Sequence, residues 1–207
     1  MELDPEVHSH RHRVGTRWID LSLALAALIL SVSSIMVALQ NHRAMQRLVT
    51  ANSWPYLELI HGNGNPDDGR PQLHLDVKNV GIGPAMIEKF VVTYAGNPVT
   101  GPADLLTRCC GPRSSWEQAQ IQINTVTERV LPAREGISFL VVPYQDANLE
   151  LFKKLDVERM KLGMAVCYAS VFNEHWITTL GQANARSVKS CEALEGPSYQ
   201  AGEIPRN

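Results

Sequence analysis

The stretch Gln72–Tyr94, QLHLDVKNVGIGPAMIEKFVVTY, decides the fold of the larger part of this chain. In its first half Leu73, Leu75 and Val77 alternate with polar residues, which predicts a strand with one buried face. Its second half, Ala85–Tyr94, is rich in β-branched and aromatic residues and predicts another strand. The glycines and proline between the two halves predict a turn.

Short apolar segments bounded by turn signals continue on both sides of this stretch. We expect a short helix or an irregular crossover around 105–117, and the signals over 146–159 are mixed but include a helical pattern. Strands are predicted at 55–60, 72–79, 85–94, 120–124, 128–131, 136–142, 160–172 and 175–180. Many short strands with little helix predict a mainly β chain whose domain is an antiparallel immunoglobulin-like β-sandwich.

An uncharged apolar run, Leu21–Leu39 (LSLALAALILSVSSIMVAL), lies near the N-terminus. As a helix it would extend roughly 28 Å, close to the thickness of a bilayer's hydrocarbon core. A buried helix of a soluble protein would usually show a polar stripe. A cleaved signal peptide would have a shorter apolar run followed by a small-residue cleavage site. We therefore predict an uncleaved transmembrane helix over 18–39, with Trp18 at the interface.

The sequence predicts five consecutive parts of the chain, of which the transmembrane helix is the second. We expect a basic N-terminal flank (1–17), the transmembrane helix (18–39), a helical stem (40–53), the β-sandwich domain (54–191) and a loose tail (192–207). The N-terminal flank is more basic than the stem, so the positive-inside rule predicts a cytoplasmic N-terminus and a domain on the outer side. The net charge of -2 argues against nucleic acid as a main partner.

Four cysteines permit two disulfides in an oxidising compartment. A bond between the neighbours Cys109 and Cys110 would close a strained ring. We therefore expect Cys109 or Cys110 to pair with Cys191. The alternative is that all four are reduced thiols, with Cys167 in a core strand.

Three motifs lie in the predicted domain. The first, Ser53–Glu58, contains Trp54, Pro55 and Tyr56. The second, Asn79–Ala85, is a turn with Asn79, Gly81, Gly83 and Pro84. The third, Tyr168–Trp176, has Tyr168 and Trp176 at its ends and a turn between them. Asn79 and Gly81 suit positive or otherwise unusual backbone angles, and Gly83-Pro84 redirects the chain.

The stretch Leu73–Val99 resembles a strand–turn–strand unit of immunoglobulin-like bacterial surface domains. Over most of its length the chain is similar to uncharacterised bacterial single-span membrane proteins that carry an apolar helix and the three motifs in this order. Here Ser53 is joined directly to Trp54, and Asn173 stands where a glycine would ease the late turn. The resemblance implies an Ig-like domain anchored in a bacterial inner membrane, and no activity.

Two clusters contain side chains that bind metals. His8, His10 and His12 alternate before the apolar helix, and Asp67 and Asp68 lie in a polar loop. The histidines are better explained as a solvated basic flank. The aspartates lack the ligand spacing of an EF-hand, so we expect a plain loop there and no metal or cofactor.

The sequence contains no nucleophile elbow, zinc-protease motif or phosphate-binding loop. We therefore expect a non-enzymatic interaction module or an accessory subunit of a membrane complex. Its partners would be the lipid bilayer, through 18–39, and a membrane or membrane-proximal protein, which includes a second copy of the chain. The alternative is a membrane-tethered hydrolase or thiol-redox protein with a site assembled from Cys109, Cys110, His61 or His175. A third class is a ligand-sensing domain that signals through the helix.

Overall fold

The computed structural model describes residues 16–64 and 70–202 of the chain. These residues form two compact units, an N-terminal helix and a β-rich domain that begins at Thr50. The histidines of the N-terminal flank and the aspartates of the polar loop lie outside the described residues.

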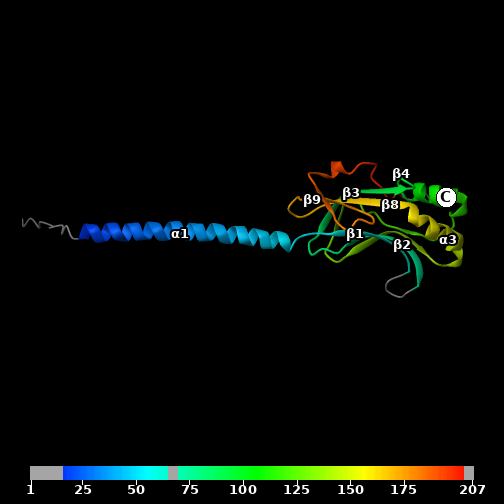
Figure 1. The fold of residues 1–207 in the computed structure, drawn as a ribbon. Helices are drawn as coiled ribbons and strands as arrows, with labels where there is room; N and C mark the ends of the chain where they lie inside the picture. The colour runs from blue at the N-terminus through cyan, green and yellow to red at the C-terminus, as the bar shows by residue number, and fades with distance from the viewer. Residues whose placement is uncertain (1–15, 65–69, 203–207) are drawn as a thin grey trace, which may run out of the picture. The chain divides into compact units, whose positions relative to one another are not determined.

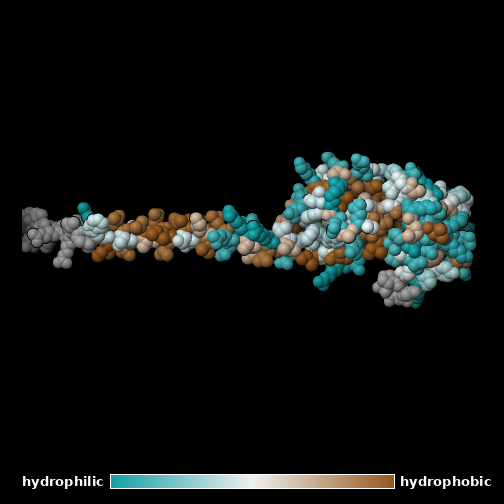
Figure 2. Space-filling model, viewed as in Figure 1, coloured by the Kyte–Doolittle hydropathy of each residue, from teal (hydrophilic) through white to brown (hydrophobic). Residues whose placement is uncertain are grey.

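The N-terminal unit is one continuous helix, α1 (Thr16–Ala51). It contains both the predicted span and most of the predicted stem. Figure 2 shows apolar side chains along the first part of α1 and polar ones where the stem begins. The hydroxyls of Ser22, Ser31 and Ser33 each donate to a carbonyl of the preceding turn at 2.8 Å, which satisfies them in an apolar setting. The predicted apolar helix is confirmed, and it is long and apolar enough to cross a membrane.

The domain contains two antiparallel sheets (Figure 1). The first has the order β1 (Leu57–Gly64), β2 (Pro71–Asn79), β7 (Gly136–Pro143), β5 (Gln122–Ile123). The second has the order β10 (Arg186–Val188), β9 (His175–Thr179), β8 (Leu162–Ala169), β3 (Ala85–Tyr94), β4 (Asn97–Val99), and β6 (Arg129–Leu131) also pairs with β3.

The two strands of the stretch 72–94 lie in different sheets. β2 pairs with β1 and β7, whereas β3 pairs with β4, β6 and β8. The turn Val80–Pro84 therefore carries the chain from one sheet to the other. This crossing allows the apolar side chains of β2 and β3 to face each other across the core.

Two helices and four short 3₁₀ turns complete the domain. Helices α2 (Pro102–Cys110) and α3 (Leu149–Glu158) contact each other and lie together at one end of the sheets, as Figure 1 shows. The 3₁₀ turns are η1 (Arg113–Ser115), η2 (Asp146–Asn148), η3 (Arg159–Lys161) and η4 (Cys191–Ala193). The predicted strand over 160–172 is shorter than expected, because η3 precedes β8 and a turn at Ser170–Asn173 follows it.

An aromatic triad joins the two sheets at the centre of the core. Phe90 of β3 and Phe139 of β7 pack edge to face with ring centroids 5.0 Å apart. Tyr199 contacts both rings, at 5.8 and 5.6 Å. Edge-to-face pairs of this kind add to the free energy gained by burying the rings.

Tyr199 belongs to the tail that the sequence predicted to be loose. Its backbone NH donates to the carbonyl of Phe90 at 2.7 Å, and the NH of Gln200 donates to Thr100 at 2.9 Å. Leu194 and Tyr199 are buried. The prediction of a loose tail is wrong for residues 192–200, because this segment supplies an aromatic side chain to the core.

The disulfide pairing also differs from the prediction. Cys191 pairs with Cys167 of β8, with Cα atoms 5.5 Å apart, and Cys109 pairs with Cys110 at the end of α2. The expected bridge from Cys109 or Cys110 to Cys191 is wrong because the tail crosses the outer face of the second sheet. There Cys191 and Leu194 pack with side chains of β3, β8 and β9, which brings Cys191 next to Cys167.

Candidate functional site

The segment that leads into the domain packs directly on the turn between the sheets. The NH of Val80 donates to the carbonyl of Tyr56 at 2.8 Å. The NH groups of Ile82 and Gly83 both donate to the carbonyl of Trp54, at 3.1 and 3.2 Å. The first two sequence motifs, which begin 26 residues apart at Ser53 and Asn79, are thus held together by backbone hydrogen bonds.

The glycines of this turn are required by close approach. A Cβ on Gly83 would lie 1.9 Å from the carbonyl oxygen of Ser53, and one on Gly81 would lie 2.4 Å from the nitrogen of Tyr56. Neither glycine has a positive φ, nor does Asn79. Of the positive or otherwise unusual angles expected at Asn79 and Gly81, the positive ones do not occur, and what excludes a side chain at the glycines is the neighbouring backbone.

Asn79 uses the full hydrogen-bonding capacity of its buried side chain. Its Nδ2 donates to the carbonyls of Gly83 at 2.8 Å and Leu131 at 3.0 Å. Its Oδ1 accepts from the NH of Gly81 at 3.0 Å and of Tyr56 at 3.3 Å. A primary amide has two donor hydrogens and two acceptor lone pairs, so every one has a partner. Asn79 thereby joins three segments of the chain.

The third motif lies against the first. The Tyr168 ring is fully buried, and its hydroxyl accepts a 3.4 Å hydrogen bond from the NH of Leu57. Burial raises the pKa of Tyr168 above its ordinary value, so the hydroxyl stays neutral. Trp176 packs on Tyr168 at 5.9 Å between ring centroids and on Trp54 at 6.5 Å. The three motifs therefore meet at one end of the domain.

This end of the domain exposes large apolar side chains. They come from the leading segment, the turn between the sheets and the β8–β9 turn: Trp54 (52% exposed), Val80 (40%), Ile82 (52%), Val171 (53%) and Phe172 (46%). We call these five residues the base surface.

The segments of the base surface are neighbours in the fold. The turn between the sheets leads into β3, and Met86 of β3 pairs with Ala169, the last residue of β8. The β8–β9 turn follows at once, with Asn173 in the left-handed region at φ 61°. Trp54 contacts the turn between the sheets through its carbonyl, and its ring contacts Trp176 of β9, the strand that follows the β8–β9 turn. Exposed apolar residues that gather in one region are a feature typical of contact surfaces.

Sequence reasoning missed the base surface because it placed Val80 and Ile82 in a turn and Val171 and Phe172 in a strand over 160–172. A signal is present in the sequence, since Val80 and Ile82 interrupt a glycine-rich turn, and Val171 and Phe172 precede the Asn-Glu turn. Turns are usually polar, and an apolar side chain in a turn has no core to enter.

Two histidines lie among charged groups on the first sheet. The Nδ1 of His61 in β1 accepts a 2.7 Å hydrogen bond from the guanidinium of Arg159, which also donates to Asp156 at 2.9 Å. His74 of β2 is paired with Asp76 at 2.6 Å. Burial lowers the pKa of His61, and the positive charge of Arg159 and the neighbouring His74 lower it further.

The residues of the alternative enzymatic site do not converge. His61 contacts Arg159, which directly precedes the start of β8, whereas His175 pairs with Ala169 at the other end of β8. Eight residues of strand separate these ends, about 26 Å. His175 instead contacts Glu88 at 3.2 Å, and Cys109 and Cys110 lie at the end of α2.

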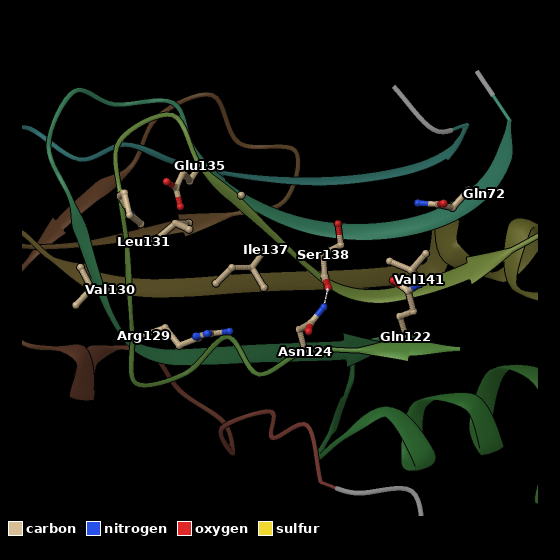
Figure 3. A pocket seen from close by; sticks show the side chains of 12 residues that line it. Gln72, Gln122, Asn124, Arg129, Val130, Leu131, Glu135, Ile137, Ser138 and Val141 are labelled. Atoms are coloured by element: carbon tan, nitrogen blue, oxygen red, sulfur yellow. Dashed lines mark hydrogen bonds between the residues drawn. The ribbon is translucent and has the colours of Figure 1, made fainter. Parts of the chain in front are cut away.

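A groove of about 490 Å³ runs along β7, between β5 and β6 (Figure 3). Its lining is mostly polar, and the Asn124 side chain donates to the carbonyl of Ser138 at 2.7 Å across it. The groove contains amides, one guanidinium and one carboxylate. These groups favour no single class of ligand. Among residues 16–64 and 70–202, no cluster of three or more His, Cys, Asp or Glu side chains is arranged to hold a metal ion.

Comparison of the sequence with protein-family profiles gives no match, and comparison with curated proteins gives none.

Proposed function

We propose that this protein is a non-enzymatic interaction module, an Ig-like β-sandwich anchored by α1 in a bacterial inner membrane. In this role it binds another membrane or membrane-proximal protein as an accessory subunit. The observation that carries the proposal is the base surface, where three segments expose Trp54, Ile82, Phe172 and their neighbours on a rigid framework. Interface cores are enriched in such aromatic and aliphatic side chains.

The framework beneath the base surface favours binding over local flexibility. Asn79 and the backbone hydrogen bonds of Trp54 fix the turn that bears Val80 and Ile82. A surface that is ordered before it binds loses less conformational entropy on association.

Membrane anchoring is supported by α1, whose apolar part matches the thickness of a bilayer. The stem from Gln40 to Ala51 would rise about 18 Å as a helix. A stem of that length favours a partner in or beside the same membrane over a distant soluble one.

The Cys167–Cys191 disulfide supports an extracytoplasmic domain, because structural disulfides persist in the periplasm and are rare in the cytosol. The greater basic charge before the apolar run supports the same orientation through the positive-inside rule.

Photo-crosslinking in intact cells tests the proposal. A photo-reactive residue is placed at Ile82 in the full chain, and the matched control carries it at Met160, an exposed apolar position beside the opposite end of β8. We expect discrete protein adducts from Ile82 and none from Met160. Equal labelling from both positions, or no adduct from Ile82, would contradict the proposal.

A further inference from the structure

We infer that the partner of the base surface is a second copy of this chain, aligned in parallel through α1. This inference rests on the proposed function and adds the identity of the partner. It joins two separate features, the apolar base surface of the domain and a heptad pattern along the helix.

The heptad pattern runs through most of α1. Alternating steps of three and four residues connect Ala24, Ala27, Ser31, Ser34, Ala38, Asn41, Met45 and Leu48. All eight side chains are exposed. This spacing is that of the a and d positions of a left-handed coiled coil, which keep one side of a helix against its partner.

We call these eight positions the seam. Their side chains differ between the apolar run and the stem, as a membrane-embedded pair of helices would require. Within Leu21–Leu39 the seam positions are only alanine and serine, and large apolar side chains flank them. Small residues let two helices approach closely in lipid, where apolar side chains gain little from leaving the solvent. In the stem the seam continues with Met45 and Leu48, which suit packing in water.

Asn41 stands in the seam at the boundary between these regions. A single asparagine in a heptad seam favours one register and one number of helices, because its amide finds a partner only in the matching copy. With parallel helices the two copies of Asn41 lie at the same height.

The connection between α1 and the domain is short. Two residues, Asn52 and Ser53, lie between Ala51, the end of α1, and Trp54, so the chain keeps Trp54 within about 10 Å of the helix end. Paired helices have axes about 8–10 Å apart. Association of the helices would therefore hold the two base surfaces at a millimolar effective concentration or higher.

The experiment uses two full-length copies with different tags, expressed together and kept in native membranes. One copy carries the photo-reactive residue at Ile82. We expect the adduct to contain both tags and to have the mass of two chains. We also expect the two tags to co-purify without irradiation after mild extraction.

Paired helix variants test the seam. Ser31→Leu with Ala38→Leu places bulky side chains on the seam, and Ser22→Leu with Ser33→Leu places the same side chains on the opposite side of α1. We expect the seam variant to lose at least tenfold in co-purification and in two-chain adduct, and the control variant to retain both. Immunoblotting of the membranes confirms equal amounts of each.

The outcomes separate this inference from the proposed function. Ile82 adducts that contain only other proteins would overturn the second-copy inference and support the interaction module. Unchanged pairing in the seam variant would also overturn the inference. The absence of any adduct would overturn both.

Discussion

The side-chain nitrogen of Asn79 donates a 3.0 Å hydrogen bond to the carbonyl of Leu131, which ties the end of β2 to strand β6 of the other sheet. The same amide makes three more hydrogen bonds, to Gly83, Gly81 and Tyr56. It thus joins both sheets and the segment that bears Trp54.

Asn79→Ala should lower the free energy of unfolding by about 2–4 kcal/mol, because it leaves buried backbone groups without partners. The measurement is chemical denaturation of the full chain in detergent. Asn97→Ala is the control, since Asn97 is exposed and its amide bonds only to the nearby carbonyl of Ala95. Similar losses in the two variants would contradict the role of Asn79.

Gly83→Ala should destabilise the domain and displace Trp54, because the added carbon would lie 1.9 Å from the Ser53 carbonyl oxygen. That neighbour is backbone and has little room to move. We expect a loss of about 2 kcal/mol or more, as for other steric insertions into packed structure. Gly64→Ala is the matched control, since no atom of residues 16–64 and 70–202 lies within 4 Å of the added carbon. Equal stability of the two variants would contradict the close-approach argument.

Removal of the Cys167–Cys191 disulfide by Cys→Ser at both positions should cost about 3 kcal/mol, as expected for a link between residues 24 apart. Removal of the Cys109–Cys110 link should cost much less, because neighbouring residues close almost no loop in the unfolded chain. Denaturant midpoints of the two double variants measure the difference. Comparable losses would show that the entropy of loop closure does not set these contributions.

The stability of the domain should fall as the pH falls below about 6.5, the ordinary pKa of histidine. The pKa of His61 is lowered in the folded state by burial, then by Arg159 and His74. Below this pH the unfolded chain therefore binds a proton at His61 more readily than the folded domain does. The free energy of unfolding decreases as a result. His61→Gln should flatten the decrease between pH 7 and pH 5. An unchanged pH profile in this variant would exclude His61 as a source of the dependence.

Local patterns predict much of this fold. The alternation of Leu73, Leu75 and Val77 places β2, and the predicted strand 85–94 matches β3 at both ends. The apolar helix follows from composition alone. Hydrophobic periodicity acts between near neighbours, so it locates elements well.

Features that depend on distant contacts were predicted poorly. The sequence alone does not show that β2 and β3 enter different sheets, that Tyr199 returns to the core, or that Cys191 lies beside Cys167. The first depends on which strands pair across the whole domain, and the other two depend on where the tail crosses the second sheet. The base surface was missed for the same reason, because exposure of Ile82 and Phe172 is a property of the assembled turns.

Thiol labelling in native membranes tests most directly whether the base surface is covered. All four native cysteines are in disulfides, so Ile82→Cys or Met160→Cys provides the one free thiol of the chain. Both positions are exposed in the isolated chain, Ile82 by 52% and Met160 by 72%. We predict that a membrane-impermeant maleimide labels position 160 in intact spheroplasts but labels position 82 only after detergent separates the partners. Equally rapid labelling of both positions in the intact membrane would contradict the account.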